Sequence, residues 1–496
     1  MNGPEFLQQL SESTGAILPM LILLITGLAL MLLDAFKQKG ALAWTAAIGM
    51  AASCILAWAT AHEGSQTVFF GMMENGGIAP LVHIFLVLSG LLTLFFLQYY
   101  LTRLDREIND VYALLIFAVL GMVLMANAND LIMVFIGLET MSMALYIFAA
   151  LFKTEKGSNE SGLKYFLLGS FASAFLLFGI ALIYGLTGYT NLDGIVANFD
   201  RLLANEQIFY AAIGLVIIGF LFKVAAFPFH SWTPDVYEGT PTPLAGFMAT
   251  GSKMAAFVAL GVFINKLGLT TNPEVEKIGT LLALAALLTM IYGNIVAARQ
   301  QNIKRMLAYS SIAHSGYVLL GLCAATIGFQ AIIFYMFIYT LMNIGAFGMV
   351  GMVEQQHEDT NLESWRGLGK SAPMFAVALS VFLFSLAGIP PLAGFMSKYQ
   401  VFITAIDQNL IFLATIGILT SVVGAYYYIR VIVLMFFNSD DQRPSFNLNF
   451  NTLPVAGIAI LVALLVIFGV APSLIYDPII EAFGAATDAA HTATLP

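Results

Sequence analysis

Seven ionisable side chains lie within or beside long apolar runs of this 496-residue chain, where they could bind and release protons. They are four lysines, two histidines and one glutamate: Lys164, Lys223, Lys253, Lys398, His230, His314 and Glu139. A charge at the centre of a bilayer costs roughly 2.5 to 3.5 kcal/mol on insertion scales, so such residues usually have a function or a partner. One carboxylate cannot neutralise several lysines. Apolar surroundings weaken the hold of a lysine on its proton and a nearby carboxylate strengthens it, so the set predicts a site of switchable proton affinity.

Simpler interpretations exist for several of these residues. Lys164 follows the polar segment KTEKGSNESG and could extend its ammonium to the lipid headgroups. Glu139 lies near the middle of its apolar run and could form a static ion pair with one lysine. Two histidines could ligate a haem from different helices, but we favour hydrogen-bonded intramembrane histidines.

The elements that position these residues are predicted to be transmembrane helices. Hydrophobic residues make up 59% of the chain and charged residues 10%, against about 25% charged in soluble proteins. Runs of roughly 20 apolar residues, enough to cross a bilayer, recur along the whole chain. The sequence therefore predicts an all-α polytopic membrane protein with about 14 helices, at residues 15–35, 41–61, 78–101, 111–126, 131–152, 162–187, 207–232, 243–267, 277–298, 306–322, 329–353, 373–403, 410–437 and 453–472.

The distribution of basic residues predicts the orientation of these helices. If the N-terminus lies outside, thirteen Lys and Arg residues fall in inner loops, and the outer loops carry only Arg201, Lys266 and Lys277. Cytoplasmic loops are enriched in Lys and Arg, so we expect both termini to lie outside a bacterial inner membrane. No basic segment precedes the first apolar run, so we expect that run to be a retained span and not a cleaved leader.

Prolines predict that the seventh and twelfth helices are broken. They occur in AAFPFHSWTP, after Lys223, and in LAGIPPLAGF, before Lys398. Proline lacks the amide proton that continues a helix, and broken helices in corresponding positions are typical of ion sites near the membrane midplane.

The two lysines also indicate an internal repeat, because they are 175 positions and five helices apart. The same offset carries the other intramembrane residues onto polar ones: Glu139 to His314, Lys164 to Tyr339 and Lys253 to Tyr428. Five is odd, so we predict two inverted repeats of five helices, although the prolines themselves do not superpose at this offset. The predicted division of the single membrane domain is 1–110 for helices 1 to 3, 111–267 and 277–437 for the repeats, and 453–496 for helix 14 and the tail.

No motif in the sequence predicts a cofactor in this chain. Cys54 and Cys323 are isolated in apolar helices, and no paired Cys or His spacing indicates an iron–sulfur or zinc site. No glycine-rich nucleotide-binding motif is present either. We therefore expect neither redox nor phosphoryl chemistry within the chain.

Five segments resemble the antiporter-like membrane subunits of respiratory complex I, NADH:quinone oxidoreductase. They are GLETMSMALYIFAA, LKYFLLGSFASAFLLFGIALIYG, FKVAAFPFHSWTPDVYEGTPTPLAGFMATGSKMAAF, RQQNIKRMLAYSSIAHSGY and SLAGIPPLAGFMSKYQVF. The similarity covers nearly the whole chain and is densest from about residue 131 to 402.

The resemblance implies a role for each intramembrane residue. Glu139 would tune the proton affinity of Lys223, Lys253 would link two half-channels, and Lys398 would control proton exit. Lys164 would be the lysine of the sixth helix, and His230 and His314 would belong to a central water-lined axis, with Ser252, Tyr309 and Ser311 as hydrogen-bonding neighbours.

The resemblance also implies proton translocation coupled to quinone reduction elsewhere in a complex. FMN, iron–sulfur clusters and quinone would then lie in partner subunits, and the partners would be peripheral subunits, neighbouring antiporter-like subunits and lipid, with no nucleic acid. Two alternatives stay open: a subunit of an Mrp-type multisubunit Na+/H+ antiporter, and a scaffold subunit that transports nothing.

Overall fold

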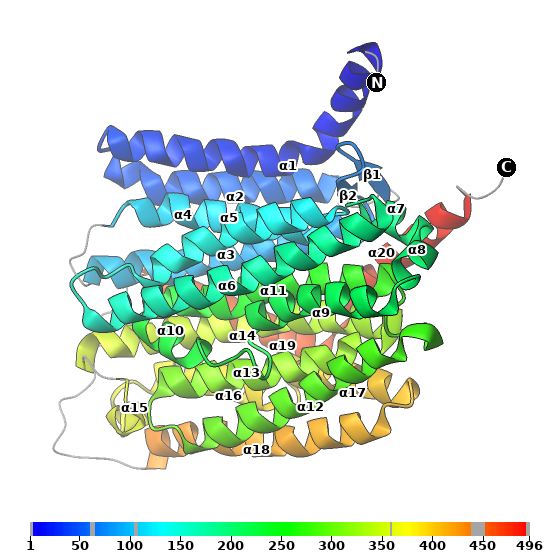
Figure 1. Cartoon of the computed structure of the whole chain (residues 1–496). Helices are drawn as coiled ribbons and strands as arrows, with labels where there is room; N and C mark the ends of the chain where they lie inside the picture. Colours follow the sequence, from blue (N-terminus) through cyan, green and yellow to red (C-terminus); the bar gives the residue numbers. More distant parts are fainter. Residues whose placement is uncertain (1–2, 60–64, 104–107, 358–359, 438–451, 493–496) are drawn as a thin grey trace.

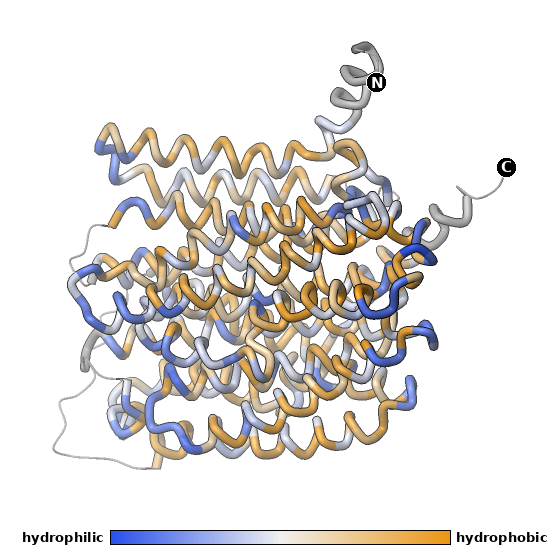
Figure 2. The backbone as a smooth tube through the Cα atoms, viewed as in Figure 1, coloured by the Kyte–Doolittle hydropathy of each residue, from blue (hydrophilic) through white to orange (hydrophobic). Residues whose placement is uncertain are grey.

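The computed structural model describes residues 3–59, 65–103, 108–357, 360–437 and 452–492. Long helices run side by side through one bundle, with apolar residues along their middles and hydrophilic residues at both ends (Figures 1 and 2). Eleven helices in the described ranges are long and apolar enough to cross a membrane. With α4, α13 and the α16–α17 pair they match the fourteen predicted spans, which confirms an all-α polytopic fold.

The helices fall into a leading group, two five-helix units and a closing group. The leading group contains α1 (Gly3–Ala35), η1 (Lys39–Ala41), α2 (Leu42–Ala59), the hairpin β1 (Gln66–Val68) and β2 (Met73–Asn75), and α3 (Ala79–Arg103). The first unit contains α4 (Asp110–Ala126), α5 (Leu131–Ala149), α6 (Lys156–Thr187), α7 (Leu192–Ala197), α8 (Phe199–Leu203), α9 (Glu206–Lys223), α10 (Thr233–Gly239) and α11 (Thr242–Lys266). The second unit contains η2 (Pro273–Val275), α12 (Glu276–Arg299), α13 (Ile303–Leu322), α14 (Ala325–His357), η3 (Leu362–Trp365), α15 (Leu368–Ser371), α16 (Pro373–Ala387), α17 (Ala393–Asp407) and α18 (Ile411–Phe437). The closing group contains α19 (Thr452–Val470) and α20 (Ser473–Thr492).

Two helices form the centre of the bundle. In α11 and α14 every residue of the apolar stretch that could cross a membrane is buried, whereas in α1, α2 and α19 one-third of the residues of that stretch are buried. A helix that is apolar on all sides can be stable either in lipid or inside a bundle, and here α11 and α14 take the inner places. Lys253, on α11, is therefore shielded from lipid on every side.

The two units are built with the same contacts. In both units the first helix packs on the second (α4 on α5, and α12 on α13) and on the last (α4 on α11, and α12 on α18). In both units the third helix packs on the two halves of the broken helix (α6 on α9 and α10, and α14 on α16 and α17). This correspondence supports the predicted repeat from geometry alone.

Each unit also has a strand-like corner, at which the start of its second helix pairs with the loop that follows its third. In the first unit Leu131 N donates to Thr190 O (2.9 Å). In the second unit Ile303 N donates to Thr360 O (2.8 Å). The first corner lies next to α7 and the second next to α15, at opposite ends of the bundle (Figure 1). The units are thus inverted with respect to each other.

Both predicted breaks are present, and the first lies directly after Lys223, as the prolines predict. Within the seventh predicted span, α9 ends at Lys223, and helix resumes with α10 at Thr233, just beyond the predicted end of the span. Within the twelfth predicted span, α16 ends at Ala387 and α17 begins at Ala393. Side chains of other helices bind part of the freed backbone: Phe227 N donates to Thr289 Oγ1 (2.9 Å). Such partners make irregular backbone tolerable at membrane depth.

Several structural elements have no counterpart in the sequence prediction, and the larger ones are as follows. They are the β1–β2 hairpin, α7, α8 and α20. The hairpin pairs Gln66 with Asn75 and adds a bridge from Met73 to Ala128. The tail predicted to follow helix 14 is helical through α20, whose Phe483 packs on Phe329 of α14 (5.5 Å).

Candidate functional site

Lys223 is the last residue of α9 and is buried at the break, with 3% of its surface exposed. Its ammonium donates to Ser142 Oγ (2.8 Å) and to Tyr165 OH (3.2 Å). The same nitrogen lies 5.8 Å from the ring centre of Tyr146 and 5.3 Å from that of Tyr165. Hydroxyl groups and ring faces, and not a carboxylate, therefore surround this lysine in the described structure.

Glu139 lies on α5, one turn before Ser142, and is half-buried. Among the described residues it forms no direct ion pair with Lys223, and its buried Oε1 has no hydrogen-bond partner. Its neighbours on the outer face of α5 are exposed, such as Ile136 and Met143. Ser142 Oγ, which accepts from Lys223, itself donates to Leu138 O, so no hydrogen bond through Ser142 links the carboxylate to the ammonium in the described structure.

Lys253 is held by helix α13. Its ammonium donates to Ser311 O (3.0 Å), Ser311 Oγ (2.7 Å) and Ser315 Oγ (3.0 Å). Ser315 Oγ in turn donates to the carbonyl of Val224 (2.7 Å), the residue that follows Lys223 in the break. A chain of hydrogen bonds therefore joins the backbone beside one buried lysine to the ammonium of the next.

The buried polar residues Lys223, Lys253, His314 and Lys398 form a row through the bundle. His314 lies on the same face of α13 as Ser311 and Ser315, since positions 311, 314 and 315 are three and four apart. Its Nδ1 pairs with Tyr335 OH (2.6 Å) and its Nε2 with Tyr428 OH (3.3 Å). The ring of Tyr339 lies 4.9 Å from the imidazole. The offset that carried Glu139 to His314 thus arrives at a buried, fully partnered histidine.

Lys398 lies in the first half of α17 and points back to the end of α16. Its ammonium donates to Leu386 O (2.9 Å), Ala387 O (3.1 Å) and Ser421 Oγ (2.9 Å). The two carbonyls close the C-terminus of α16, the negative end of its dipole, which favours a cation. The nitrogen also lies 5.5 Å from the ring centre of Tyr317, and that ring is 5.6 Å from His314.

A cavity of about 440 Å³ opens beside Lys398 between α17 and α18. Its walls are mainly apolar, and its polar side chains are Lys398, Tyr399 and Ser421. The row of buried groups therefore has space beside its last lysine.

His230 lies in the break between α9 and α10. It stacks on Phe227 (5.5 Å) and on Tyr292 of α12 (4.4 Å), and its Nδ1 is buried without a partner among the described residues. Of the weaker candidates, Ser311 binds Lys253, whereas Ser252 Oγ donates to Met248 O within its own helix (2.6 Å).

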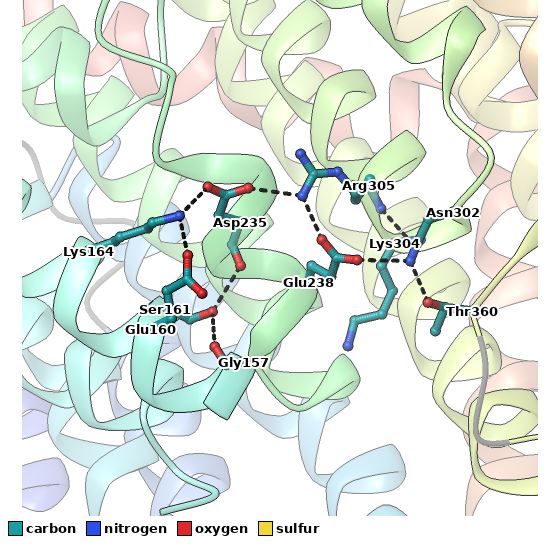
Figure 3. A network of polar contacts seen from close by, with 10 residues as sticks. All are labelled: Gly157, Glu160, Ser161, Lys164, Asp235, Glu238, Asn302, Lys304, Arg305 and Thr360. Carbon is teal, nitrogen blue, oxygen red and sulfur yellow. Dashed lines mark hydrogen bonds and ion pairs between the residues drawn. The ribbon is translucent and has the colours of Figure 1, made fainter. Parts of the chain in front are cut away.

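Lys164 lies apart from this row, in a charged network at the end of the bundle (Figure 3). We call this the basic end, because Lys164, Lys304, Arg305 and Arg366 lie there. Lys164 contacts Glu160 (2.6 Å) and Asp235 (2.8 Å), and its side chain is 40% exposed. Arg305 bridges Asp235 (2.9 Å) to Glu238 (2.6 Å), so the network ties α6 to α10 and α13.

The sequence analysis missed a buried ion pair beside this network. Lys304, with 4% of its side chain exposed, contacts Glu354 Oε1 (3.2 Å) and donates to Thr240 O (3.0 Å). Thr242 and Tyr100 also donate to Glu354. Lys304 is one of the thirteen basic residues that the sequence analysis places in inner loops. Its position within the family-like segment RQQNIKRMLAYSS is the signal that could have indicated a buried, paired lysine.

A cavity of about 450 Å³ lies among these charges. Its charged lining residues are Glu155, Glu160, Asp235, Glu238, Lys304, Arg305 and Glu354. Because its walls bear both signs of charge, the cavity can admit water and exchange protons at this end of the bundle; we call it the basic-end cavity.

Comparisons with known proteins agree on the kind of chain this is. Residues 128–424 match the family described as NADH:quinone oxidoreductase/Mrp antiporter, TM. NADH-quinone oxidoreductase subunit N of Salinibacter ruber is 41% identical over 423 residues, which cover 84% of this chain and 83% of that protein. Subunit N of Trichlorobacter lovleyi is 42% identical over 471 residues, or 92% of this chain and 94% of that protein.

Solved structures give the same result for the fold. A chain of respiratory complex I from Thermus thermophilus with bound Aureothin is 33% identical, with a TM-score of 0.78 over 92% of this chain and 98% of that one. A chain of the Mrp complex from Dietzia sp. has a TM-score of 0.82 over 96% of this chain and 97% of that one. At 18% identity, that second likeness concerns the fold alone.

Proposed function

The chain belongs to the NADH:quinone oxidoreductase/Mrp antiporter family, and from that premise we propose that it translocates protons as a membrane subunit of an NADH:quinone oxidoreductase, of the N type. It acts in a translocase and holds no redox centre of its own. Electron transfer from NADH to quinone takes place in partner subunits that carry FMN and iron–sulfur clusters. The partners in the membrane are other subunits of the complex, neighbouring antiporter-like subunits among them.

The observation that carries this proposal is the set of partners around the buried lysines. Among the described residues, Lys223, Lys253 and Lys398 are bound by hydroxyls and backbone carbonyls and by no carboxylate. Lysines at the ends of the bundle differ, since each of four has an acidic partner: Lys164, Lys266, Lys277 and Lys304. A hydroxyl can accept from an ammonium or donate to a neutral amine, so these partners tolerate both protonation states.

Each residue has a defined part in this function. Lys223 is the central carrier, and the negative charge of Glu139 strengthens its hold on the proton. Lys253 receives the proton across Ser315, and His314 passes it towards Lys398, which controls release. His230 and Lys164 lie on the approach, at the break and at the basic end.

The orientation and division of the chain follow from the same argument. The basic end faces the cytoplasm of a bacterium, and both termini lie outside the inner membrane. Residues 111–267 and 277–437 form the inverted units, 1–110 packs beside them, and 453–496 closes the bundle.

The second candidate is a subunit of an Mrp-type Na+/H+ antiporter, favoured by the shared fold. Purification of the native complex separates the two functions, because flavin, iron–sulfur centres and NADH oxidation would be absent from an Mrp complex. A complex without them that exchanges Na+ for H+ would overturn the first assignment.

Lys223→Ala is the direct test of the carrier. We expect proton translocation and coupled quinone reduction to fall by roughly tenfold or more with assembly intact, because the variant loses the proton-binding group and a costly buried charge. Glu139→Gln should act in the same direction. The matched control is Lys277→Ala, which removes an exposed lysine paired with Glu206. Near-normal pumping by an assembled complex that carries both Lys223→Ala and Glu139→Gln would leave only the scaffold interpretation.

A further inference from the structure

Buried polar atoms without a hydrogen-bond partner are concentrated in one region of the bundle. Among the side chains that the structure describes there are nine such atoms, and five of them lie on α14 or on the segment that leads into and through α10. They are His230 Nδ1, Thr233 Oγ1, Tyr237 OH, Tyr339 OH and Asn343 Oδ1. Buried polar groups almost always bind protein or ordered water, so this concentration indicates a hydrated region.

The five atoms form two stripes. Thr233 and Tyr237 are four positions apart on α10, which places them on one face of that helix. His230 lies in the turn that leads into α10, where Thr233 N donates to His230 O (3.0 Å). Tyr339 and Asn343 are four apart on α14 and likewise share a face.

The two stripes face each other. The ring of Tyr237 lies 6.3 Å from that of Phe347, which is one turn beyond Asn343 on the same face of α14. Ser311 is close enough to interact with the hydroxyls of both Tyr237 and Tyr339. The polar atoms of α10, α13 and α14 therefore converge on one place.

That place lies between the basic-end cavity and a buried lysine. On one side, Thr240, three positions after Tyr237 at the end of α10, lines the cavity together with Asp235 and Glu238. On the other side, Ser311 Oγ accepts a hydrogen bond from Lys253 (2.7 Å). The stripes thus lead to Lys253 without passing Lys223.

We propose that the two stripes line a hydrated branch that carries protons between the basic-end cavity and Lys253, with the hydroxyls of Tyr237 and Tyr339 as relays. The inference rests on the proposed function and adds path residues to it. Each hydroxyl accepts a proton from the preceding water while it releases its own to the next oxygen. One O–H bond forms as another breaks, and the tyrosine stays neutral overall.

Replacement by phenylalanine separates this role from a structural one. The rings would keep their packing, for example that of Tyr237 on Trp232 (6.0 Å) and Phe347. Each change would remove only a buried hydroxyl that makes no hydrogen bond in the described structure and whose polar neighbour is Ser311, so we expect little cost in stability. A purely structural residue would therefore show unchanged pumping and an equal or higher melting temperature.

The test uses the complete complex in native membrane vesicles with Tyr237→Phe, Tyr339→Phe and the double variant. NADH-driven proton uptake and quinone reduction are measured in H2O and in D2O. The control is Tyr476→Phe, because Tyr476 packs on Phe334 of the same helix (5.5 Å) but lies outside both stripes. We expect the double variant to lose roughly threefold or more of its proton translocation, with a larger solvent isotope effect, and the control to match the parent.

Normal translocation by the assembled double variant, or by both single variants if the double does not assemble, would overturn the branch. Lys253→Met is measured in parallel. Loss of pumping in Lys253→Met alone would reject the branch and leave the proposed function standing, whereas normal pumping in all variants would reject both. Ordered water density beside Tyr237 and Tyr339 in a high-resolution structure of the complex would support the branch, and a dry region would contradict it.

Discussion

Lys223, Lys253 and Lys398 are surrounded by oxygen atoms that carry no net charge. Their identities could be predicted from the sequence, because a lysine inside an apolar run stands out. Their partners could not, because Ser142, Ser315 and Ser421 come from helices far away in the sequence, and serine is common in membrane helices. The described structure has no direct ion pair between Glu139 and Lys223: the ammonium donates to Ser142 Oγ, and Glu139 Oε1 has no hydrogen-bond partner.

Lys398 offers the sharpest residue-scale prediction. Lys398→Glu would place a negative charge against the carbonyls of Leu386 and Ala387, where like charges repel strongly in a medium of low dielectric. Lys398→Arg keeps the positive charge but resists deprotonation. We expect proton translocation in assembled complexes to fall in both variants, and to fall further in Lys398→Glu. Equal and mild losses would show that Lys398 is a structural charge.

At the scale of elements, helices with strong apolar runs were predictable and short polar ones were not. The fourteen spans and both breaks follow from hydrophobicity and proline. The β1–β2 hairpin, α7, α8 and α20 are held by contacts with distant loops and helices, which no local pattern reveals. The 175-residue offset paired the right helices but not equivalent places in them: Lys223 ends the first half of its broken helix, whereas Lys398 lies in the second half.

The Lys304–Glu354 pair leads to a prediction about what holds the helices together at the basic end. It joins α13 to α14 and, through Thr240 and Thr242, to the corner between α10 and α11. Glu354→Gln leaves a buried ammonium without its anion, which we expect to cost about 3 kcal/mol and to lower the melting temperature of the complex.

Replacement of both members of this pair by apolar residues, in Lys304→Met with Glu354→Leu, should cost less than the single change. The control is Glu206→Gln, which breaks an exposed pair and should have little effect. If the double variant were less stable than Glu354→Gln, the hydrogen bonds of Lys304 and Glu354, and not the balance of their charges, would hold α13 and α14 to the connection between α10 and α11.

At the scale of the whole molecule, the two inverted units form one bundle whose two ends differ. The terminal helices α1 and α20 both project from one end of the bundle, and the charged network of Figure 3 lies at the other. Composition and the count of spans predicted this arrangement. The contacts that make the units equivalent required the structure.

Orientation gives the prediction that belongs to this scale. A reporter that is active only in the cytoplasm, fused after Pro496, should stay silent, because an even number of spans returns the chain to the side on which it began. The same reporter inserted after Lys153, in a basic loop, should be active. Strong activity from the C-terminal fusion would mean that one span has been miscounted.

The two strand-like corners also bear on how the chain is made. Each corner joins residues from a single unit, so the first unit can close on itself while the ribosome is still synthesising the second. Helix α14 cannot be completed in this way, because it packs on α3 and α11, made before it, and on α16, α17 and α19, made after it. Its burial is therefore complete only after α19 and α20 have emerged from the insertion machinery. Until then we expect a long helix that carries Asn343 and two tyrosines to be exposed to lipid or to an insertion chaperone.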